Sequence, residues 1–210
     1  MTPERTAGHR TAINHLKRVD PKLRKAIARV GPCRFAPITD GTHFHFILRA
    51  IVYHQLSTKA AGTIHRRFLE LFDAPEPRPH AVAAMPDAKL RAAGLSRQKL
   101  SYIKDLARKV VTGEVPLDNI GALNDAAAIA ELTKVKGIGV WSAQMFLIFR
   151  LGRPDVLPVT DLAIQKGVKR VHGLRTMPSP KRVLKIGAPW SPYATIASWY
   201  LWRSLDGPAA

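Results

Sequence analysis

The sequence predicts an all-α protein, and three observations support this fold class. Residues that favour helix N-caps recur along the chain, each before a stretch with helical spacing. Apolar residues repeat at three- and four-residue steps, as at Ile64, Phe68 and Leu71, which places them on one helix face. The period-two alternation with turn pairs that is typical of β-hairpins is not seen. The start signals predict roughly ten helices.

The first part of the chain is divided by candidate caps, with a proline at the first helical position after Asp20. The predicted helices cover 21–30 before Gly31, 43–56 after Thr42, 58–72 after Ser57, 97–111 after Ser96 and before Gly113, and 125–135 after Asn124 or Asp125. The segment 74–86 holds four prolines and predicts a loop. Residues 1–10 predict a loose basic tail.

The last part of the chain repeats the same signals. Asp161 opens a predicted helix that is closed by Gly173. Serine followed by proline predicts two more helix starts, at Ser179 and Ser191. These helices are expected to run to about 186 and about 205, with the usual uncertainty at helix ends.

The charge of the chain points to a polyanionic partner. Thirty-three Lys and Arg stand against 15 Asp and Glu, which gives a net charge of +18. Such an excess is typical of nucleic-acid-binding proteins, although a generally basic proteome would produce it too. The single cysteine, Cys33, excludes an intrachain disulfide and a four-cysteine zinc or iron–sulfur site.

Targeting and membrane signals are not evident. The N-terminal residues lack an apolar signal core, and no apolar run approaches the roughly 20 residues of a membrane span. We therefore expect an intracellular protein without membrane association, cytoplasmic and close to the nucleoid in a bacterium, or nuclear in a eukaryote.

A glycine turn between two helical patterns is the first functional candidate. Residues 135–139 read VKGIG, and another helix follows at once. Backbone N–H groups at a helix N-terminus bind phosphate, and glycines let a partner come close. A plain turn between two helices is the alternative. The candidate phosphate-binding residues are Lys134, Lys136, Gly137, Ile138, Gly139 and Val140, together with Ser57.

Asp161 is the second candidate. It is the only acidic residue between Val156 and Leu205, a stretch with eight Lys and Arg. Its simplest role is an N-cap. A carboxylate in a surface that binds phosphate also suits a reaction in which positive charge develops, such as the oxocarbenium ion of a sugar that loses its base.

Five segments together resemble the helix-hairpin-helix (HhH-GPD) DNA glycosylase superfamily, and most closely its 3-methyladenine DNA glycosylase II branch. They are residues 51–64 (IVYHQLSTKAAGTI), 91–107 (RAAGLSRQKLSYIKDLA), 132–143 (LTKVKGIGVWSA), 151–163 (LGRPDVLPVTDLA) and 190–203 (WSPYATIASWYLWR). The likeness covers about residues 40–205. It implies one domain, 1–210, with two helical lobes. One lobe would use about 35–135, the other about 1–34 plus 136–210, and the helix-hairpin-helix motif, 132–149, would lie at their junction.

The resemblance also implies an activity. The chain would flip an alkylated purine, of the 3-methyladenine or 7-methylguanine type, out of damaged double-stranded DNA and hydrolyse its N-glycosidic bond. Asp161 falls at the catalytic aspartate of the family. Bifunctional relatives carry a nucleophilic lysine where Trp141 stands here, so we expect no AP-lyase activity. A monomer without an obligate protein partner is expected.

Pocket and wedge residues follow from the same resemblance. The base pocket would use Trp141, Trp190, Tyr53, Met145 and Leu162, with Tyr193 a weaker candidate. Leu162 stands where some relatives have an aromatic residue, and Met145 lies one turn after Trp141, where an aromatic residue would help. The less aromatic pocket would also admit neutral lesions such as ethenoadenine or hypoxanthine. Either Gln55 or Leu56 would fill the gap left by the flipped base. His54 departs from the QQLS that many relatives show; it would probe the minor groove or be an ordinary turn residue.

No cofactor is expected to be required. In the family the hairpin carbonyls, here those of Thr133, Val135 and Ile138, often hold a monovalent cation, Na⁺ or K⁺. Two other functions stay open at this point. The chain could be a glycosylase for another lesion, such as ethenoadenine, hypoxanthine or uracil, or a non-catalytic helix-hairpin-helix DNA-binding protein.

Overall fold

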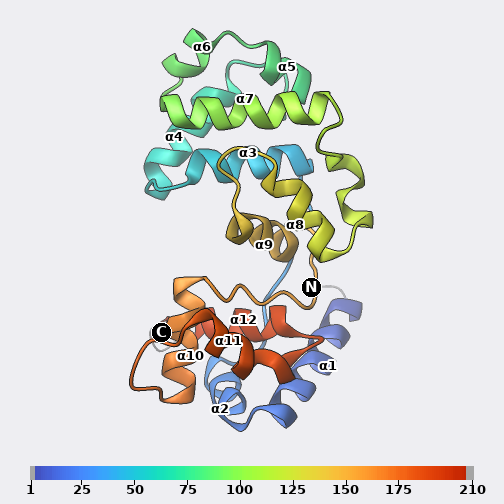
Figure 1. Cartoon of the computed structure of the whole chain (residues 1–210), viewed down its shortest axis with the longest axis vertical. Coiled ribbons are helices and arrows are strands. Elements are labelled where there is room, and N and C mark those ends of the chain that lie inside the picture. Colours follow the sequence, from blue (N-terminus) through green and yellow to red (C-terminus); the bar gives the residue numbers. More distant parts are fainter. Residues whose placement is uncertain (1–2, 207–210) are drawn as a thin grey trace. The chain divides into compact units, whose positions relative to one another are not determined.

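The computed structural model describes residues 3–206, and helices and loops account for all of that part of the chain (Figure 1). The predicted all-α class is confirmed. The helices are α1 (Pro3–Val19), α2 (Pro21–Val30), α3 (His43–Tyr53), α4 (Thr58–Leu69), α5 (Pro79–Ala84), α6 (Asp87–Ala92), α7 (Arg97–Val111), α8 (Asp125–Thr133), α9 (Val140–Phe149), α10 (Leu162–His172), α11 (Pro180–Gly187) and α12 (Ala194–Arg203), with 3-10 helices η1 (Leu117–Ala122) and η2 (Ala188–Trp190). No helix among the described residues is long and apolar enough to cross a membrane.

The chain divides into two compact units. Unit 1 comprises Met1–Pro37 and Leu147–Ala210, and unit 2 comprises Ile38–Phe146. The division differs from the predicted lobes, because residues 136–146 belong to unit 2. Packing explains this difference: the ring of Phe146 lies edge-on to those of His43 and Phe46, with centroids 5.4 and 5.6 Å apart. These contacts hold the first part of α9 against α3.

Unit 2 is built around α3 and α7. Helix α7 runs alongside α5 and also packs on α3 (Figure 1). The buried apolar side chains come from both long helices and from the segments beside them, chiefly Phe44, Leu48, Phe68, Ile103, Leu106 and Ile120. Burial of such side chains supplies most of the stabilisation of each helix.

Unit 1 joins the two ends of the chain. Helices α1 and α2 pack on α10 and α12, around a core that includes Leu16, Leu23, Ile164, Trp190 and Tyr200. Gly167 allows the close approach of α10 to α12, since a Cβ atom there would lie 2.8 Å from the Leu201 carbonyl oxygen.

The predicted N-caps are confirmed at seven helices. In each case the capping side chain accepts a hydrogen bond from a backbone N–H of the first turn, which satisfies a donor that the helix itself cannot. These residues are Asp20, Thr42, Ser57, Ser96, Asn124, Asp161 and Ser179.

Three local predictions are wrong. Helix α1 begins at Pro3, so residues 3–10 are helical rather than a loose tail. The segment 74–86 contains the short helix α5. Ser191 does not cap the last helix, which begins at Ala194. Asp155 takes that role instead, because its Oδ1 accepts the Ala194 N–H at 3.1 Å while its Oδ2 accepts the Ser191 hydroxyl at 2.5 Å.

Candidate functional site

The turn between α8 and α9 folds tightly over α7. Gly137 has a φ of 81°, in the left-handed region that favours glycine. A Cβ atom at Gly137 would lie 2.2 Å from the ring of Tyr102, so no other residue fits there without displacement. A Cβ atom at Gly139 would meet nothing within 4 Å. Gly139 therefore faces open space, in which a partner can approach the backbone.

The N-terminus of α9 carries the predicted phosphate donors. Among the described residues, the N–H groups of Gly137, Gly139 and Val140 donate to no protein acceptor. The predicted donor Ile138 differs, because its N–H donates to the Val135 carbonyl at 3.1 Å. Unpaired amides at a positive helix end form an anion-binding site.

The two predicted lysines of the hairpin differ in their surroundings. Lys134 places its ammonium 2.8 Å from both carboxylate oxygens of Glu131, so part of its charge is already compensated. The side chain of Lys136 is exposed beside the amides. Lys136 is therefore the better placed of the two to meet a phosphate.

The hairpin carbonyls that the resemblance assigns to a monovalent cation have an oxygen-only donor set, which suits a hard ion. The Val135 oxygen already accepts one hydrogen bond, from Ile138. A carbonyl oxygen has two lone pairs, so this bond leaves capacity for a cation. The donor chemistry of these carbonyls is thus compatible with such an ion, and the Val135 oxygen is still able to coordinate one.

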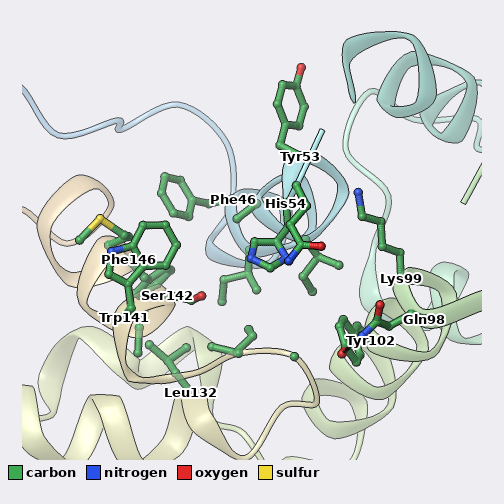
Figure 2. Close-up of a pocket in the computed structure, with 18 residues that line it drawn as sticks. Phe46, Tyr53, His54, Gln98, Lys99, Tyr102, Leu132, Trp141, Ser142 and Phe146 are labelled. Carbon is green, nitrogen blue, oxygen red and sulfur yellow. Dashed lines mark hydrogen bonds between the residues drawn. The ribbon is translucent and has the colours of Figure 1, made fainter. Parts of the chain in front are cut away.

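A cavity of about 440 Å³ opens in unit 2 between α3, α7 and α9 (Figure 2). It brings together seven of the residues predicted from the sequence: Tyr53, His54, Gln55, Gly137, Ile138, Trp141 and Met145. Trp141, at the start of α9, is 41% exposed. A large indole that is held at a cavity and left open to solvent is suited to stacking on a planar ligand.

Eleven further lining residues were not predicted from the sequence, among them Phe46, Gln98, Lys99, Tyr102 and Phe146. Gln98 and Tyr102 lie one turn apart on α7, and the Gln98 amide donates to the Tyr102 hydroxyl at 2.7 Å. The four-residue spacing of this pair was visible in the sequence. None of the described residues that line the cavity is acidic. Its walls are mostly aromatic and apolar, with a few polar side chains that include the basic Lys99.

Lys99 ties α7 to the end of α3. Its ammonium donates to the Val52 carbonyl at 2.7 Å, and burial lowers the pKa of the amine. Val52 is the second-to-last residue of α3, directly before Tyr53 and the turn that joins α3 to α4. Lys99 thereby stabilises the helix end from which that turn departs.

The turn at residues 54–56 is strained and exposed. Helix α3 ends at Tyr53 rather than at 56, because His54 has a ψ of 128°, outside the helical range, and Gln55 after it has a φ of 56°. Non-glycine residues in that region are uncommon and cluster at functional sites. Leu56 is 40% exposed, and Ser57 next to it caps α4 by accepting the Ala60 N–H. His54 is exposed as well, so the turn presents three successive side chains to solvent.

Tyr53 lines the cavity only in part. The Arg49 guanidinium lies 4.7 Å from the centroid of its ring, and the His65 ring lies edge-on to it at 5.9 Å. Figure 2 shows the Tyr53 hydroxyl directed away from Trp141. Trp141 is therefore the stronger candidate for stacking on a ligand in this cavity.

Trp190 is not a pocket residue, which corrects the prediction. Its side chain is fully buried in unit 1, and its indole N–H donates to Asp20 Oδ2 at 2.9 Å. Burial by itself raises the pKa of Asp20. Three hydrogen-bonding partners have the opposite effect and outweigh burial, so the pKa is lowered to about 2. They are the His172 side chain, the Leu23 N–H and the Trp190 N–H. Trp190 and Asp20 thus form a structural pair in the core.

Asp161 is held rigidly at the start of α10 in unit 1. It is 9% exposed, and its Oδ1 accepts the Ile164 N–H at 2.8 Å and the Trp202 indole N–H at 3.3 Å. The preceding loop is tied to α12, because the Thr195 hydroxyl donates to the Arg153 carbonyl and accepts the Val156 N–H. Leu162, beside the carboxylate, is 58% exposed.

Most of the excess charge of the chain belongs to the unit that carries Asp161. Unit 1 contains 19 Lys and Arg against 5 Asp and Glu, whereas unit 2 contains 14 against 10. The positive potential of such a basic unit attracts a polyanion.

Comparison with known proteins gives consistent results. Residues 48–192 match the profile of the HhH-GPD superfamily base excision DNA repair proteins. The chain is 33% identical over 193 residues to the DNA-3-methyladenine glycosylase 1 of Schizosaccharomyces pombe, an alignment that covers 90% of this chain and 85% of the relative.

Two solved structures superpose well. The 3-methyladenine DNA glycosylase of Schizosaccharomyces pombe in complex with abasic DNA has a TM-score of 0.80 at 33% identity, over 91% of this chain and 95% of that one. The DNA-3-methyladenine glycosidase of Bacillus halodurans also has a TM-score of 0.80, at 34% identity, over 90% and 85% of the two chains. The chain therefore belongs to the HhH-GPD superfamily of base excision DNA repair proteins.

Proposed function

We propose that the chain is a monofunctional DNA glycosylase that excises alkylated purines, of the 3-methyladenine and 7-methylguanine type, from double-stranded DNA. The observation that carries the proposal is the buried and doubly hydrogen-bonded Asp161 in a strongly basic unit of an HhH-GPD chain. The names of the relatives support the substrate class, since they are 3-methyladenine glycosylases.

Phosphate binding is assigned to the start of α9. The unpaired N–H groups of Gly137, Gly139 and Val140 would donate to one backbone phosphate, and the exposed Lys136 would add charge. Neutralising phosphates releases counterions, so the affinity should fall steeply with salt. This contact positions the chain on the duplex without reading its sequence.

Base recognition is assigned to Trp141 and the aromatic cavity. A base must leave the duplex before its glycosidic bond can be reached. Alkylated purines such as 3-methyladenine carry positive charge, which favours the electron-rich face of an indole. The cavity is lined by Lys99 and, among the described residues, by no acidic side chain, so a cationic base would be held by the aromatic rings alone and a neutral lesion would fit as well.

The chemical step is assigned to Asp161. The bond between C1′ and the base nitrogen breaks, and its electron pair goes to the base, so that a cationic purine leaves as a neutral molecule. The sugar becomes an oxocarbenium ion, which the carboxylate stabilises. Water adds to C1′ and loses a proton. Trp141 offers no amine for a Schiff base, so the product is an abasic site in an intact strand.

No cofactor enters these steps. A monovalent cation held by the carbonyls of Thr133, Val135 and Ile138 would add positive charge next to the bound phosphate. Its contribution would be to DNA affinity, and the residues that would hold it are part of the hairpin backbone.

The test is base release from methylated duplex DNA by the wild type and by Asp161→Asn. We expect the wild type to release 3-methyladenine or 7-methylguanine, with strand breaks only after alkali treatment. The variant should bind DNA and lose most of the excision. Asp206→Asn is the matched control, because Asp206 belongs to the same unit and is exposed in an ion pair with Arg203. Full turnover by Asp161→Asn would contradict the assignment.

The alternatives predict different outcomes. Release of ethenoadenine, hypoxanthine or uracil, but of no methylated purine, would move the chain to another glycosylase specificity. Tight and salt-sensitive duplex binding without any base release would favour a non-catalytic DNA-binding protein.

A further inference from the structure

Three side chains of helix α7 contact the hairpin between α8 and α9. Tyr102, Asp105 and Lys109 are spaced by three and four residues, which places them on one face of the helix. Tyr102 supports Gly137, whose missing Cβ leaves room for its ring. Asp105 and Lys109 meet the backbone of the residues before Gly137.

An acidic and a basic side chain bind the hairpin backbone at two points. The Lys109 ammonium donates to the Lys134 carbonyl, and Asp105 Oδ2 accepts the Lys136 N–H at 2.8 Å. Lys109 and Asp105 also pair with each other at 3.2 Å, and their side chains are only 11% and 7% exposed. The cation thus meets a backbone acceptor, and the carboxylate meets a backbone donor.

The attraction between the two charges does not by itself explain a buried pair of this kind. Desolvation of two charges costs about as much as their attraction returns, and apolar replacements of similar volume are often neutral or stabilising. The backbone contacts offer a different explanation. They fix the orientations of the peptide groups on both sides of Val135, directly before the unpaired amides of Gly137, Gly139 and Val140.

We propose that Asp105 and Lys109 are positioning residues that hold the hairpin, residues 134–139, in the conformation that binds DNA phosphate. The inference rests on the proposed DNA-binding function of the hairpin. The pair would support DNA binding indirectly, by holding the hairpin in place from α7, without contacting DNA itself.

The test is the double substitution Asp105→Leu/Lys109→Met. It leaves the net charge of the chain unchanged, so any change in the salt dependence of DNA binding reports a lost phosphate contact rather than a lost charge. The probe is a duplex with a tetrahydrofuran abasic analogue, which is bound but not cut. We expect the variant to stay folded but to unfold at a lower urea concentration, because the Lys134 carbonyl and the Lys136 N–H lose their partners. The dissociation constant for the duplex should rise about tenfold. The slope of log K against log salt should become less steep by about one unit.

A matched control lies on the same helix. Lys104 pairs with Asp87 at 3.5 Å and donates to the carbonyls of Ala83 and Met85, away from the hairpin. The double substitution Asp87→Leu/Lys104→Met should leave the affinity and the salt slope unchanged. Hydrogen exchange gives a second readout without DNA, because the Lys136 amide should exchange faster only in the Asp105/Lys109 variant.

The outcomes separate the two proposals. Unchanged affinity, salt slope and Lys136 exchange in Asp105→Leu/Lys109→Met would overturn the positioning role, whether or not the wild type excises bases. A wild type that excises no base, with a variant that still binds with a smaller slope, would overturn only the glycosylase. Should the apolar variant fail to fold, Asp105→Asn/Lys109→Gln keeps the polar shape and the net charge. This variant should also raise the dissociation constant and make the salt slope less steep. If neither quantity changes, the proposal is overturned.

Discussion

The indole N–H of Trp202 lies 3.3 Å from Oδ1 of Asp161, the same oxygen that accepts the Ile164 N–H at 2.8 Å. One of these donors belongs to the backbone of α10 and the other to a side chain of α12. The Trp202 ring is itself held in place, because it stacks on Phe149 with centroids 5.6 Å apart. The carboxylate is therefore oriented from two directions before any substrate binds, which is the preorganisation that electrostatic catalysis requires.

Trp202→Phe should reduce excision without reducing DNA affinity. The substitution keeps an aromatic ring against Phe149 and removes only the donor to Asp161. A hydrogen bond to a charged group is worth about 1.5–3 kcal/mol, so the single-turnover rate should fall by about tenfold or more. The dissociation constant for abasic-analogue DNA should change by less than about twofold. Trp199→Phe is the control, because the Trp199 ring contacts Tyr200. Equal single-turnover rates in wild type and Trp202→Phe would show that the indole does not orient the carboxylate.

Gly137→Ala and Gly139→Ala should separate folding from binding. At Gly137 the new methyl group meets the Tyr102 ring and the backbone has a positive φ. The variant should lose about 1–3 kcal/mol of unfolding free energy as well as DNA affinity. At Gly139 the methyl group enters open space, so stability should be kept while affinity falls, because the methyl group obstructs the approach of phosphate. Urea unfolding and duplex titration measure the two effects. If both variants lost the same unfolding free energy, the proposed contrast between a crowded Gly137 and an open Gly139 would be wrong.

Local signals in the sequence predicted the helix starts well. A cap depends on one side chain and the next three residues, so Asp20, Thr42 and Ser179 could be recognised without tertiary information. Ser191 shows the limit of recognising caps from local sequence. Its sequence context resembles a helix start, but the carboxylate of Asp155, far away along the chain, caps α12 instead. Partners that only the fold brings together could not be predicted in this way.

Several residues of the candidate site were named from the sequence, but the residues that hold them in place were not. Trp141, His54 and Gln55 line one cavity, whereas the resemblance assigned only Trp141 of these to the base pocket and the turn to the wedge. Trp190 was predicted to line the pocket but is buried in the core of unit 1. Whether an aromatic residue lines a pocket or fills a core depends on tertiary packing, which the spacing of residues in the sequence does not encode. The Asp105–Lys109 pair was not recognised for a related reason. In the sequence it looks like an exposed i,i+4 pair on a helix, and only the structure shows that the hairpin covers it.

Leu56→Ala should reduce excision from duplex DNA more than from single-stranded DNA. Leu56 is an exposed apolar side chain in a turn whose preceding residue, Gln55, has a φ of 56°, so it is displayed for insertion into a base stack. A plug is needed only where a base leaves a duplex. Gln55→Gly should affect excision less, and it should leave the stability unchanged or raise it, because glycine adopts a positive φ without strain. The ratio of duplex to single-strand rates measures the effect. A larger drop for Gln55→Gly would assign the wedge to Gln55.

Asp20→Asn should destabilise unit 1 near neutral pH but not in strong acid. The pKa of Asp20 is lowered from 3.8 to about 2 in the folded chain, so its ionised form stabilises the fold. That contribution is complete above about pH 4 and is lost as the pH falls toward about 2. The shift corresponds to about 2 kcal/mol, and the variant also weakens the acceptor of the Trp190 N–H. Urea unfolding of the wild type and the variant at pH 6 and pH 2.5 measures the difference. We expect a difference of about 2 kcal/mol at pH 6 that narrows markedly at pH 2.5. A difference that stays constant between these pH values would mean that Asp20 contributes through its geometry as an N-cap and not through its charge.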